Sequence, residues 1–313
     1  MKNYALAIHG GAGTILKNTM TPEKELLYKN GLQHAIEAGE MILKSGGSAF
    51  DAVEKAIIEL ENNPLFNAGK GAVFTNNGTH ELDASIMNGN NLMAGAVAGV
   101  HNIKNPIALA RGVMEQSEHV LLTGNGAMDF AKKINTPLEN DDYFFVQLRY
   151  DQLQQALQSN TMVLDHTVDK TKNNEKKFGT VGCVALDMNG NLAAGTSTGG
   201  MTNKKFGRVG DSAIIGAGTY ANNKTCAISC TGHGELFMRS VVAYDISCLM
   251  EYKSLTLKEA CQVVVMDKLV KIGGEGGLIA LDSNGNIELP FNSDGMYRAS
   301  KKQNEQIFIG IYK

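Results

Sequence analysis

The feature that most constrains this 313-residue chain is a polar stretch near its middle that ends at the start of a strand. Residues 164–177 (LDHTVDKTKNNEKK) contain almost no apolar side chains, so they cannot bury enough surface to fold by themselves. Gly179-Thr180 follow, and the apolar strand pattern VGCVALD begins immediately afterwards. Because helix and strand patterns occur on both sides, we predict one domain over residues 1–313, interrupted by a disordered linker at about 161–178.

The order of the expected elements predicts an α+β fold in which antiparallel sheets are covered by helices on both faces. Thr21-Pro22 and Ser48 have residue types that begin helices, and apolar side chains recur at helical spacing after each of them. Asn-Gly pairs between short apolar runs predict hairpins. The expected elements are, in chain order, a strand at 5–8, two helices before residue 64, a β region at about 66–105, helical segments at 106–134 and 148–160, hairpins after 180, helices at about 235–252 and 256–272, a hairpin from 277 and a final strand at 306–313.

Composition excludes several classes of partner. A formal net charge of −3 gives no reason to expect nucleic acid or an acidic membrane surface. No stretch approaches the roughly 20 apolar residues of a membrane span, and the first apolar run is too short for a signal-peptide core. The five cysteines show no CxxC spacing, so we expect buried free thiols in a reducing cytoplasm, without a zinc site.

Thr180 is the first candidate for chemistry. A hydroxyl is a poor nucleophile until a base takes its proton, and the α-amine of an N-terminal threonine, with a pKa of about 7.7–8.0, can be that base. Such a role requires a cut between Gly179 and Thr180, and the glycine tolerates the strained backbone that the cut needs. On these residues alone, an ordinary strand threonine is the competing interpretation.

Three further groups could join Thr180 in one site. Thr198 lies at the far end of the predicted hairpin, where antiparallel pairing would bring it beside Thr180. Arg208 and Asp211 in GRVGDS suit the carboxylate and the ammonium of an amino acid, although a surface salt bridge would also explain them. The segment 230–234 (CTGHG) runs from a strand into a helix, where backbone N–H groups could stabilise an oxyanion.

Other interpretations fit the context less well. Residues 195–199 (GTSTG) match the G-x-S-x-G pattern of α/β-hydrolases, with Ser197 as nucleophile and His233 as base, but no helix follows directly. GGAG, GNGAM and GGEGG lack the full pattern of a phosphate-binding loop. A non-enzymatic amino-acid-binding protein would explain Arg208 and Asp211, but not a polar stretch placed directly before Thr180.

With these residues in view, the sequence resembles the plant-type asparaginase/isoaspartyl peptidase family of N-terminal-nucleophile (Ntn) hydrolases over nearly its whole length. The motifs that carry the resemblance are IHGGAG at 8–13, NPLFNAGKGAVFT at 63–75, HELDASIM at 80–87, GAVAGV at 95–100, GTVGCVALD at 179–187, TSTGGMTNK at 196–204, GRVGDS at 207–212, SCTGHGE at 229–235 and LPFNSDGMYRA at 289–299. The resemblance implies an αββα sandwich, self-cleavage into chains 1–179 and 180–313, and a dimer of the resulting αβ units.

The resemblance also implies roles for individual residues. Thr180 would be the nucleophile and its freed amine the base, with autocleavage at Gly179–Thr180. The other catalytic positions would be Thr198, Thr231, Gly232 and Asn67, and those that bind substrate would be Arg208, Asp211 and Gly234. L-asparagine and isoaspartyl dipeptides would be the substrates; N4-glycosylated asparagine is the alternative that related glycosylasparaginases suggest.

The resemblance implies no cofactor for catalysis. It does imply a structural sodium ion, held by the backbone carbonyls of Leu60, Glu61, Asn63, Phe66, Ala68 and Lys70. His233 departs from the expected pattern, since a smaller residue is expected between Gly232 and Gly234. It could narrow the leaving-group side of the pocket, or it could cap the helix that follows.

Overall fold

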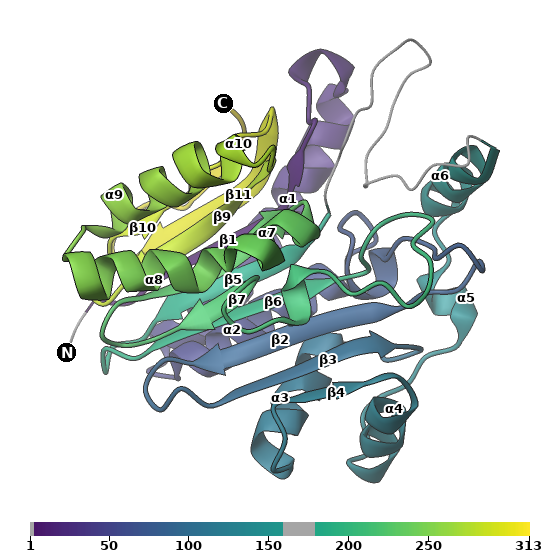
Figure 1. Cartoon of the computed structure of the whole chain (residues 1–313), viewed down its shortest axis with the longest axis horizontal. Helices are drawn as coiled ribbons and strands as arrows, with labels where there is room; N and C mark the ends of the chain where they lie inside the picture. Colours follow the sequence, from purple (N-terminus) through teal and green to yellow (C-terminus); the bar gives the residue numbers. More distant parts are fainter. Residues whose placement is uncertain (1–2, 159–178) are drawn as a thin grey trace.

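A computed structural model describes residues 3–158 and 179–313, so the predicted linker lies outside the described residues. The described part has a mixed α+β structure with two β-sheets (Figure 1). The strands of the eight-stranded sheet are, in spatial order, β12 (Phe308–Tyr312), β11 (Gly295–Lys302), β1 (Ala5–Gly13), β5 (Val181–Leu186), β6 (Leu192–Thr198), β2 (Leu82–Asn88), β3 (Ala94–Val100) and β4 (Leu121–Thr123). Those of the four-stranded sheet are β10 (Ile287–Glu288), β9 (Gly276–Asp282), β8 (Cys226–Gly232) and β7 (Thr219–Ala221).

The helices begin where the sequence supplies capping residues. The Thr21 hydroxyl accepts a hydrogen bond from the Lys24 N–H, and the Ser48 hydroxyl accepts one from the Asp51 N–H. The helices are α1 (Pro22–Lys44), α2 (Ala49–Glu61), α3 (Pro106–Gln116), α4 (Gly124–Lys133), α5 (Asp141–Phe144), α6 (Gln147–Gln158), α7 (Gly234–Ser240), α8 (Val242–Lys253), α9 (Leu257–Cys261) and α10 (Leu269–Lys271), with a π-helical segment at Gln262–Lys268 between the last two.

Two apolar cores lie on opposite faces of the eight-stranded sheet. One joins side chains of α1, α2 and α3 to strands such as β1 and β5. The other joins the opposite face of β1, β5 and β6 to β8 and β9, and extends to α7, α8 and α9 (Figure 1). Alternation along β5 divides its side chains between these cores: Cys183 belongs to the first and Val184 to the second. All five cysteines are free thiols, and four of them are buried as predicted, whereas Cys248 is only half-buried.

Three expectations about the elements were wrong. The first strand does not end at Ile8 but continues through the glycines to Gly13, with a bulge between His9 and Ala12. The region 106–134 contains β4, which pairs in parallel with β3, so the sheet is not wholly antiparallel. The helix expected at 235–252 is interrupted at Val241, whose left-handed φ of 47° separates α7 from α8.

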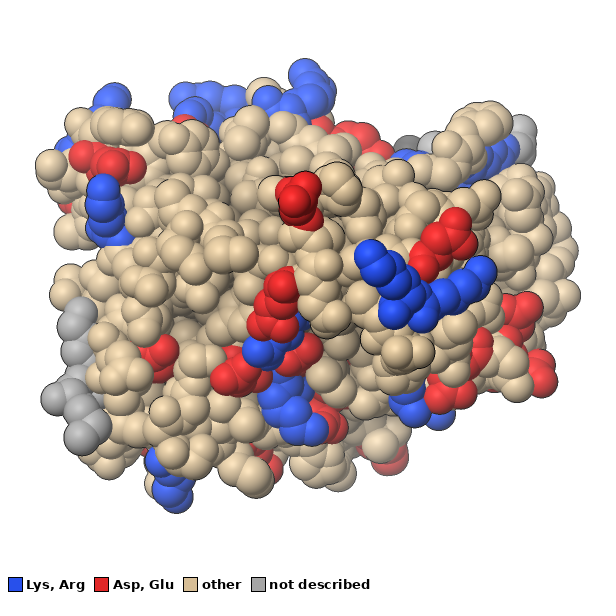
Figure 2. Space-filling model, turned by 90° about the horizontal axis from the view of Figure 1, so that it is seen from below, with Lys and Arg blue, Asp and Glu red and all other residues tan. Residues whose placement is uncertain are grey.

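The charged side chains are mixed on the face seen in Figure 2, where Lys and Arg alternate with Asp and Glu in small groups separated by uncharged surface. Among the described residues, no helix combines the length and the apolar character that crossing a membrane would need.

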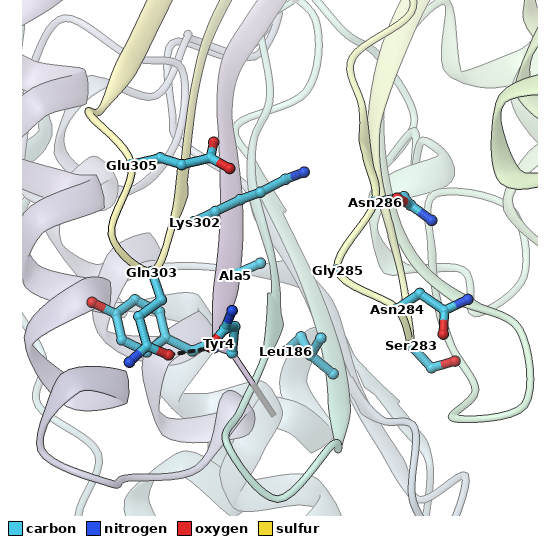
Figure 3. Close-up of a pocket in the computed structure, with 11 residues that line it drawn as sticks. Tyr4, Ala5, Leu186, Ser283, Asn284, Gly285, Asn286, Lys302, Gln303 and Glu305 are labelled. Carbon is cyan, nitrogen blue, oxygen red and sulfur yellow. Dashed lines mark hydrogen bonds between the residues drawn. The ribbon is translucent and has the colours of Figure 1, made fainter. Parts of the chain in front are cut away.

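A cavity of about 350 Å³ lies at the end of the sheets remote from Thr180. Leu186, which lines it, is the last residue of β5, whereas Thr180 directly precedes the first. Figure 3 shows the cavity between the start of β1, with Tyr4 and Ala5, and the turn that carries Asn284 and Asn286. None of the residues predicted to act in catalysis or substrate binding lines this cavity.

Candidate active site

The β5–β6 hairpin brings Thr180 and Thr198 together. Val181 pairs with Ser197 across the hairpin, so Thr180 and Thr198 occupy adjacent positions at its open end. The Thr180 hydroxyl donates a hydrogen bond of 3.3 Å to the Thr198 hydroxyl, and both side chains are buried. The local register therefore places a second hydroxyl beside the predicted nucleophile.

The carbonyl oxygen of Gly179 accepts two hydrogen bonds from side chains. Asn67 Nδ2 donates at 2.8 Å and Thr198 Oγ1 at 2.9 Å. The Asn67 side chain is itself held in place, because Nδ2 also donates to the Gly200 carbonyl at 2.7 Å and Oδ1 accepts from the Val73 N–H at 2.9 Å. The uncut peptide bond thus lies between donors that would polarise its carbonyl.

Thr231 and Gly232 end β8 beside this hairpin. Thr231 is fully buried, and its hydroxyl oxygen accepts a hydrogen bond of 3.2 Å from the Ala12 N–H at the far end of β1. Gly232 lines the same small cavity as Thr180. A methyl group at Gly232 would overlap the Phe237 ring, which explains why this position has no side chain.

Asp211 is a buried carboxylate with one oxygen, Oδ2, that has no hydrogen-bond partner among the described residues. Burial raises the pKa of Asp211 to about 7, although the charge of Arg208 opposes this rise. A methyl group at Gly234 would lie 2.9 Å from Asp211 Oδ1 and 3.0 Å from Arg208 Nη2. Gly234 therefore lies beside both charged groups.

Arg208 is not paired with Asp211, as the alternative of a surface salt bridge would require, but with Glu235. Its Nε and Nη2 each donate a hydrogen bond of 2.8 Å to one oxygen of the Glu235 carboxylate. His233 Nε2 lies 3.2 Å from Glu235 Oε2. Burial acts to raise the pKa of Glu235, but the bonds from His233 and Arg208 outweigh it and hold this pKa well below its usual value.

The sequence analysis missed Glu235 as a functional candidate. Its only signal was an acidic residue directly after Gly234 in CTGHGE, and nothing in the sequence identifies Arg208, 27 positions away, as its partner. His233 occupies the N-cap position of α7, but its side chain makes no capping hydrogen bond and contacts Glu235 instead.

The cavity between these residues has a volume of only about 20 Å³. That volume holds about one water molecule and no amino acid. Gly179 forms part of its wall, together with Thr180, Thr198 and Asp211. The main chain at Gly179 therefore occupies part of the space beside Thr180.

Ser197, the nucleophile of the α/β-hydrolase interpretation, points away from this cavity. Its hydroxyl donates a hydrogen bond of 2.6 Å to Glu61 Oε1 at the end of α2, and both residues are fully buried. Ser197 is not followed by the helix that a nucleophile elbow requires, since β6 leads into an irregular segment. The geometry therefore rejects Ser197 as a nucleophile.

The loop after α2 is the segment that the resemblance connects with sodium. Gly69, with a φ of 51°, lies so close to the Glu61 carbonyl that a side chain would overlap it, and a side chain at Gly71 would overlap the Phe66 carbonyl even more closely. The carbonyls that accept a backbone N–H are those of Leu60, Asn63, Phe66 and Ala68. Carbonyl oxygens are hard donors of the kind that an alkali cation takes, but these four already accept backbone hydrogen bonds, and the Leu60 carbonyl accepts two.

A buried arginine that the sequence analysis missed also binds this loop. Arg149 of α6 donates from Nε to the Gly71 carbonyl at 3.0 Å and from Nη2 to the Leu65 carbonyl at 3.3 Å. Its position in a helical pattern gave no sign that its side chain is buried.

Comparison with known proteins shows a match over nearly the whole chain. A family model described as asparaginase matches residues 2–311. The chain belongs to the asparaginase family. Among the relatives, the isoaspartyl peptidase of Salmonella typhimurium is 53% identical over 316 residues, with 100% of both chains covered. The isoaspartyl peptidase of Escherichia coli is 52% identical over 313 residues, which covers 100% of this chain and 97% of that relative.

The asparaginase family extends to eukaryotes at lower identity. The probable isoaspartyl peptidase/L-asparaginase 2 of Arabidopsis thaliana is 40% identical over 330 residues, with 100% of both chains covered. Because these relatives match from end to end, the similarity includes both segments that flank residues 159–178.

Proposed function

We propose that this protein is an autoprocessed threonine hydrolase that cleaves the side-chain amide of L-asparagine and the isopeptide bond of isoaspartyl dipeptides. One observation carries the proposal: the Thr180 hydroxyl is hydrogen-bonded to the Thr198 hydroxyl, and the Gly179 carbonyl accepts hydrogen bonds from the side chains of Asn67 and Thr198. Membership of the asparaginase family and the names of the relatives support the choice of substrates.

Self-cleavage would begin with attack of Thr180 Oγ1 on the Gly179 carbonyl carbon. The bond from that carbon to the Thr180 nitrogen breaks, the nitrogen takes up the hydroxyl proton, and an ester replaces the amide. Asn67 Nδ2 and the Thr198 hydroxyl already donate to the oxygen on which negative charge develops. Water then hydrolyses the ester, which yields chains 1–179 and 180–313 and restores the hydroxyl.

Turnover would use the new N-terminus. The free amine of Thr180 takes the hydroxyl proton as Oγ1 attacks the β-carbonyl of the substrate, while the Thr231 hydroxyl and the Gly232 N–H stabilise the oxyanion. The amine then gives its proton to the leaving group, which departs as ammonia or an amino acid. Water hydrolyses the β-aspartyl ester and releases aspartate.

The head group of the substrate would bind between opposite charges. Arg208 keeps the Nη1 side of its guanidinium available for the α-carboxylate, because Glu235 uses Nε and Nη2. The buried Asp211 Oδ2 would receive the α-ammonium, helped by the carbonyl of Gly234. This arrangement anchors the part that asparagine and isoaspartyl dipeptides share and leaves the departing group free to differ.

The remaining parts of the proposal concern assembly and surroundings. The cores on both faces of the eight-stranded sheet support an αββα sandwich of the Ntn-hydrolase type. We propose a dimer of αβ units, with a native mass about twice 33.6 kDa, and a structural sodium ion on the loop 60–70 that takes no part in the reaction. The free thiols suit the reducing cytoplasm in which we propose that the enzyme acts.

The test is the chain composition and activity of purified protein. We expect fragments of about 19 and about 14 kDa from the 33.6-kDa chain, with TVGCV at the start of the smaller one. Thr180→Ala should stay uncut and hydrolyse neither asparagine nor an isoaspartyl dipeptide, whereas Ser197→Ala should be cut and active. An active, uncut Thr180→Ala protein contradicts the proposal. Faster turnover of N4-glycosylated asparagine than of both other substrates would favour the glycosylasparaginase alternative.

A further inference from the structure

A buried chain of hydroxyl groups runs between the two sheets and reaches Thr180 through His9. His9 Nδ1 lies 3.1 Å from the Thr180 carbonyl oxygen, and His9 Nε2 lies 2.9 Å from Ser229 Oγ. The successive oxygen–oxygen distances beyond Ser229 are 2.6 Å to Thr196, 2.5 Å from Thr196 to Thr219 and 2.8 Å from Thr219 to Ser85. All five side chains are fully buried, and none has a role in the proposed reaction.

Gly182 makes this chain of hydrogen bonds sterically possible. His9, Gly182, Thr196 and Ser85 are register partners on β1, β5, β6 and β2, so they form one row on the same face of the sheet. Gly182 leaves a gap in that row, and the Ser229 hydroxyl from the other sheet enters it. A methyl group at Gly182 would overlap Ser229 Oγ. The glycine two residues after Thr180 therefore has a defined steric function.

The partners of His9 determine which of its ring nitrogens carries the proton. A carbonyl oxygen only accepts, so His9 Nδ1 donates to Thr180. Burial lowers the pKa of His9 to about 3, although the bond to Thr180 opposes this, and the ring is therefore neutral. Nε2 must then accept from Ser229, whose single proton is used in this bond. Beyond Ser229, Thr219 donates to Thr196, while the Thr196 and Ser85 hydroxyls also donate to the backbone carbonyls of Gly218 at 3.1 Å and Ser212 at 2.6 Å.

We propose that His9, held by this hydroxyl chain, is a positioning residue that fixes the main chain of Thr180 in the cleaved enzyme. Before the cut, Thr180 is anchored by peptide bonds on both sides. Afterwards it keeps only the bond to Val181, and the hydrogen bond from His9 to its carbonyl restrains the plane of that remaining peptide. Both the nucleophile and the base belong to this one residue, so a small displacement would move both. The inference rests on the proposed function.

Two substitutions test the hydrogen bonds of the two His9 ring nitrogens separately. In His9→Asn, the side-chain amide nitrogen can take the place of Nδ1 and donate to Thr180, while the group at the Nε2 position is lost. In His9→Gln, the amide oxygen can take the place of Nε2 and accept from Ser229, while the donor to Thr180 is lost. Both variants remove the ring, so a defect in packing alone would affect them similarly.

For processed protein, we expect His9→Gln to lower kcat for L-asparagine about 100-fold with little change in KM, and His9→Asn to lower it less than tenfold. Equal losses in the two variants, or a loss confined to KM, would overturn the inference.

A spectroscopic measurement on the wild-type protein tests the same geometry without activity. Two-dimensional 1H–15N spectra of histidine-labelled protein distinguish which ring nitrogen carries the proton. We expect His9 to be neutral with its proton on Nδ1 between pH 5 and 8, and a proton on Nε2 would overturn the inference. If the wild-type protein hydrolyses neither substrate, the proposed function fails. The spectrum still tests the hydrogen bonds of His9 in that case, because it does not depend on activity.

Discussion

Asn67 donates a hydrogen bond of 2.8 Å to the carbonyl oxygen of Gly179, although 112 positions separate the two residues along the chain. The bond places an amide dipole at the oxygen that would become negatively charged during self-cleavage. Thr198 adds a second donor at 2.9 Å, so the peptide bond before Thr180 is polarised in the uncut protein.

The first prediction concerns this pair. Asn67→Asp keeps the size of the side chain but replaces the donor with a carboxylate, which repels the developing oxyanion. We expect self-cleavage to slow by about 100- to 1,000-fold, the usual effect of removing one such donor. The rate of loss of the 33.6-kDa precursor on gels measures it, with Asn90→Asp at an exposed turn as the control. Cleavage at the wild-type rate would contradict the role of Asn67.

A second prediction concerns the residue that holds Arg208. The carboxylate of Glu235 offers Arg208 two acceptor oxygens, and Glu235→Gln leaves only one. The substitution therefore removes one hydrogen bond to a charged group, and such a bond contributes about 1.5–3 kcal/mol. We expect KM for L-asparagine to rise about tenfold or more, with kcat changed by less than threefold. A lower KM would instead show that Glu235 competes with the substrate carboxylate for Arg208.

A third prediction follows from the raised pKa of Asp211. In the proposed mode of binding, the α-ammonium of asparagine pairs with the ionised Asp211 carboxylate, and a pKa of about 7 means that this ionised form is lost as the pH falls below 7. We therefore expect kcat/KM for asparagine to fall below pH 7 more steeply than titration of the Thr180 amine alone would cause. Succinamic acid lacks the α-amine and should not show the additional fall. Identical pH profiles for the two substrates would contradict this role of Asp211.

A fourth prediction concerns the stability of the fold. Glu61 is fully buried beneath the hairpin, and burial raises its pKa to about 8, although its bonds to Ser197 and to the Ile107 N–H oppose this. The folded protein therefore keeps a proton on Glu61 that the unfolded chain loses above about pH 4. As a result, the stability of the folded protein declines as the pH rises from about 4 to about 8. Glu61→Gln abolishes this decline.

The measurement for Glu61 is the melting temperature as a function of pH. Relative to wild type, Glu61→Gln should gain on the order of 2 kcal/mol in stability between pH 6 and 9. Glu59→Gln, which changes a partly exposed partner of Lys55, is the matched control and should show no such trend. A constant difference between Glu61→Gln and wild type at all pH values would contradict the raised pKa.

Some features of this protein are determined by short stretches of sequence. The caps at Thr21 and Ser48 begin helices because their hydroxyls bond N–H groups only three positions away. Thr180 and Thr198 lie side by side because both are at the open end of one hairpin. The register of that hairpin follows from the alternation of its side chains and from its turn. Both inferences could be drawn from the sequence because each depends on residues that are close along the chain.

The tertiary structure alone decided the partners of the buried polar groups. Arg208 and Asp211 are three positions apart, yet the arginine pairs with Glu235, and Asn67 bonds Gly179 across 112 positions. A buried donor or acceptor must be satisfied by whatever group the packing brings near it, and that group can come from any segment. Gly182 shows the same principle. The need for a glycine at this position arises only because the second sheet places the Ser229 hydroxyl where a side chain would otherwise lie.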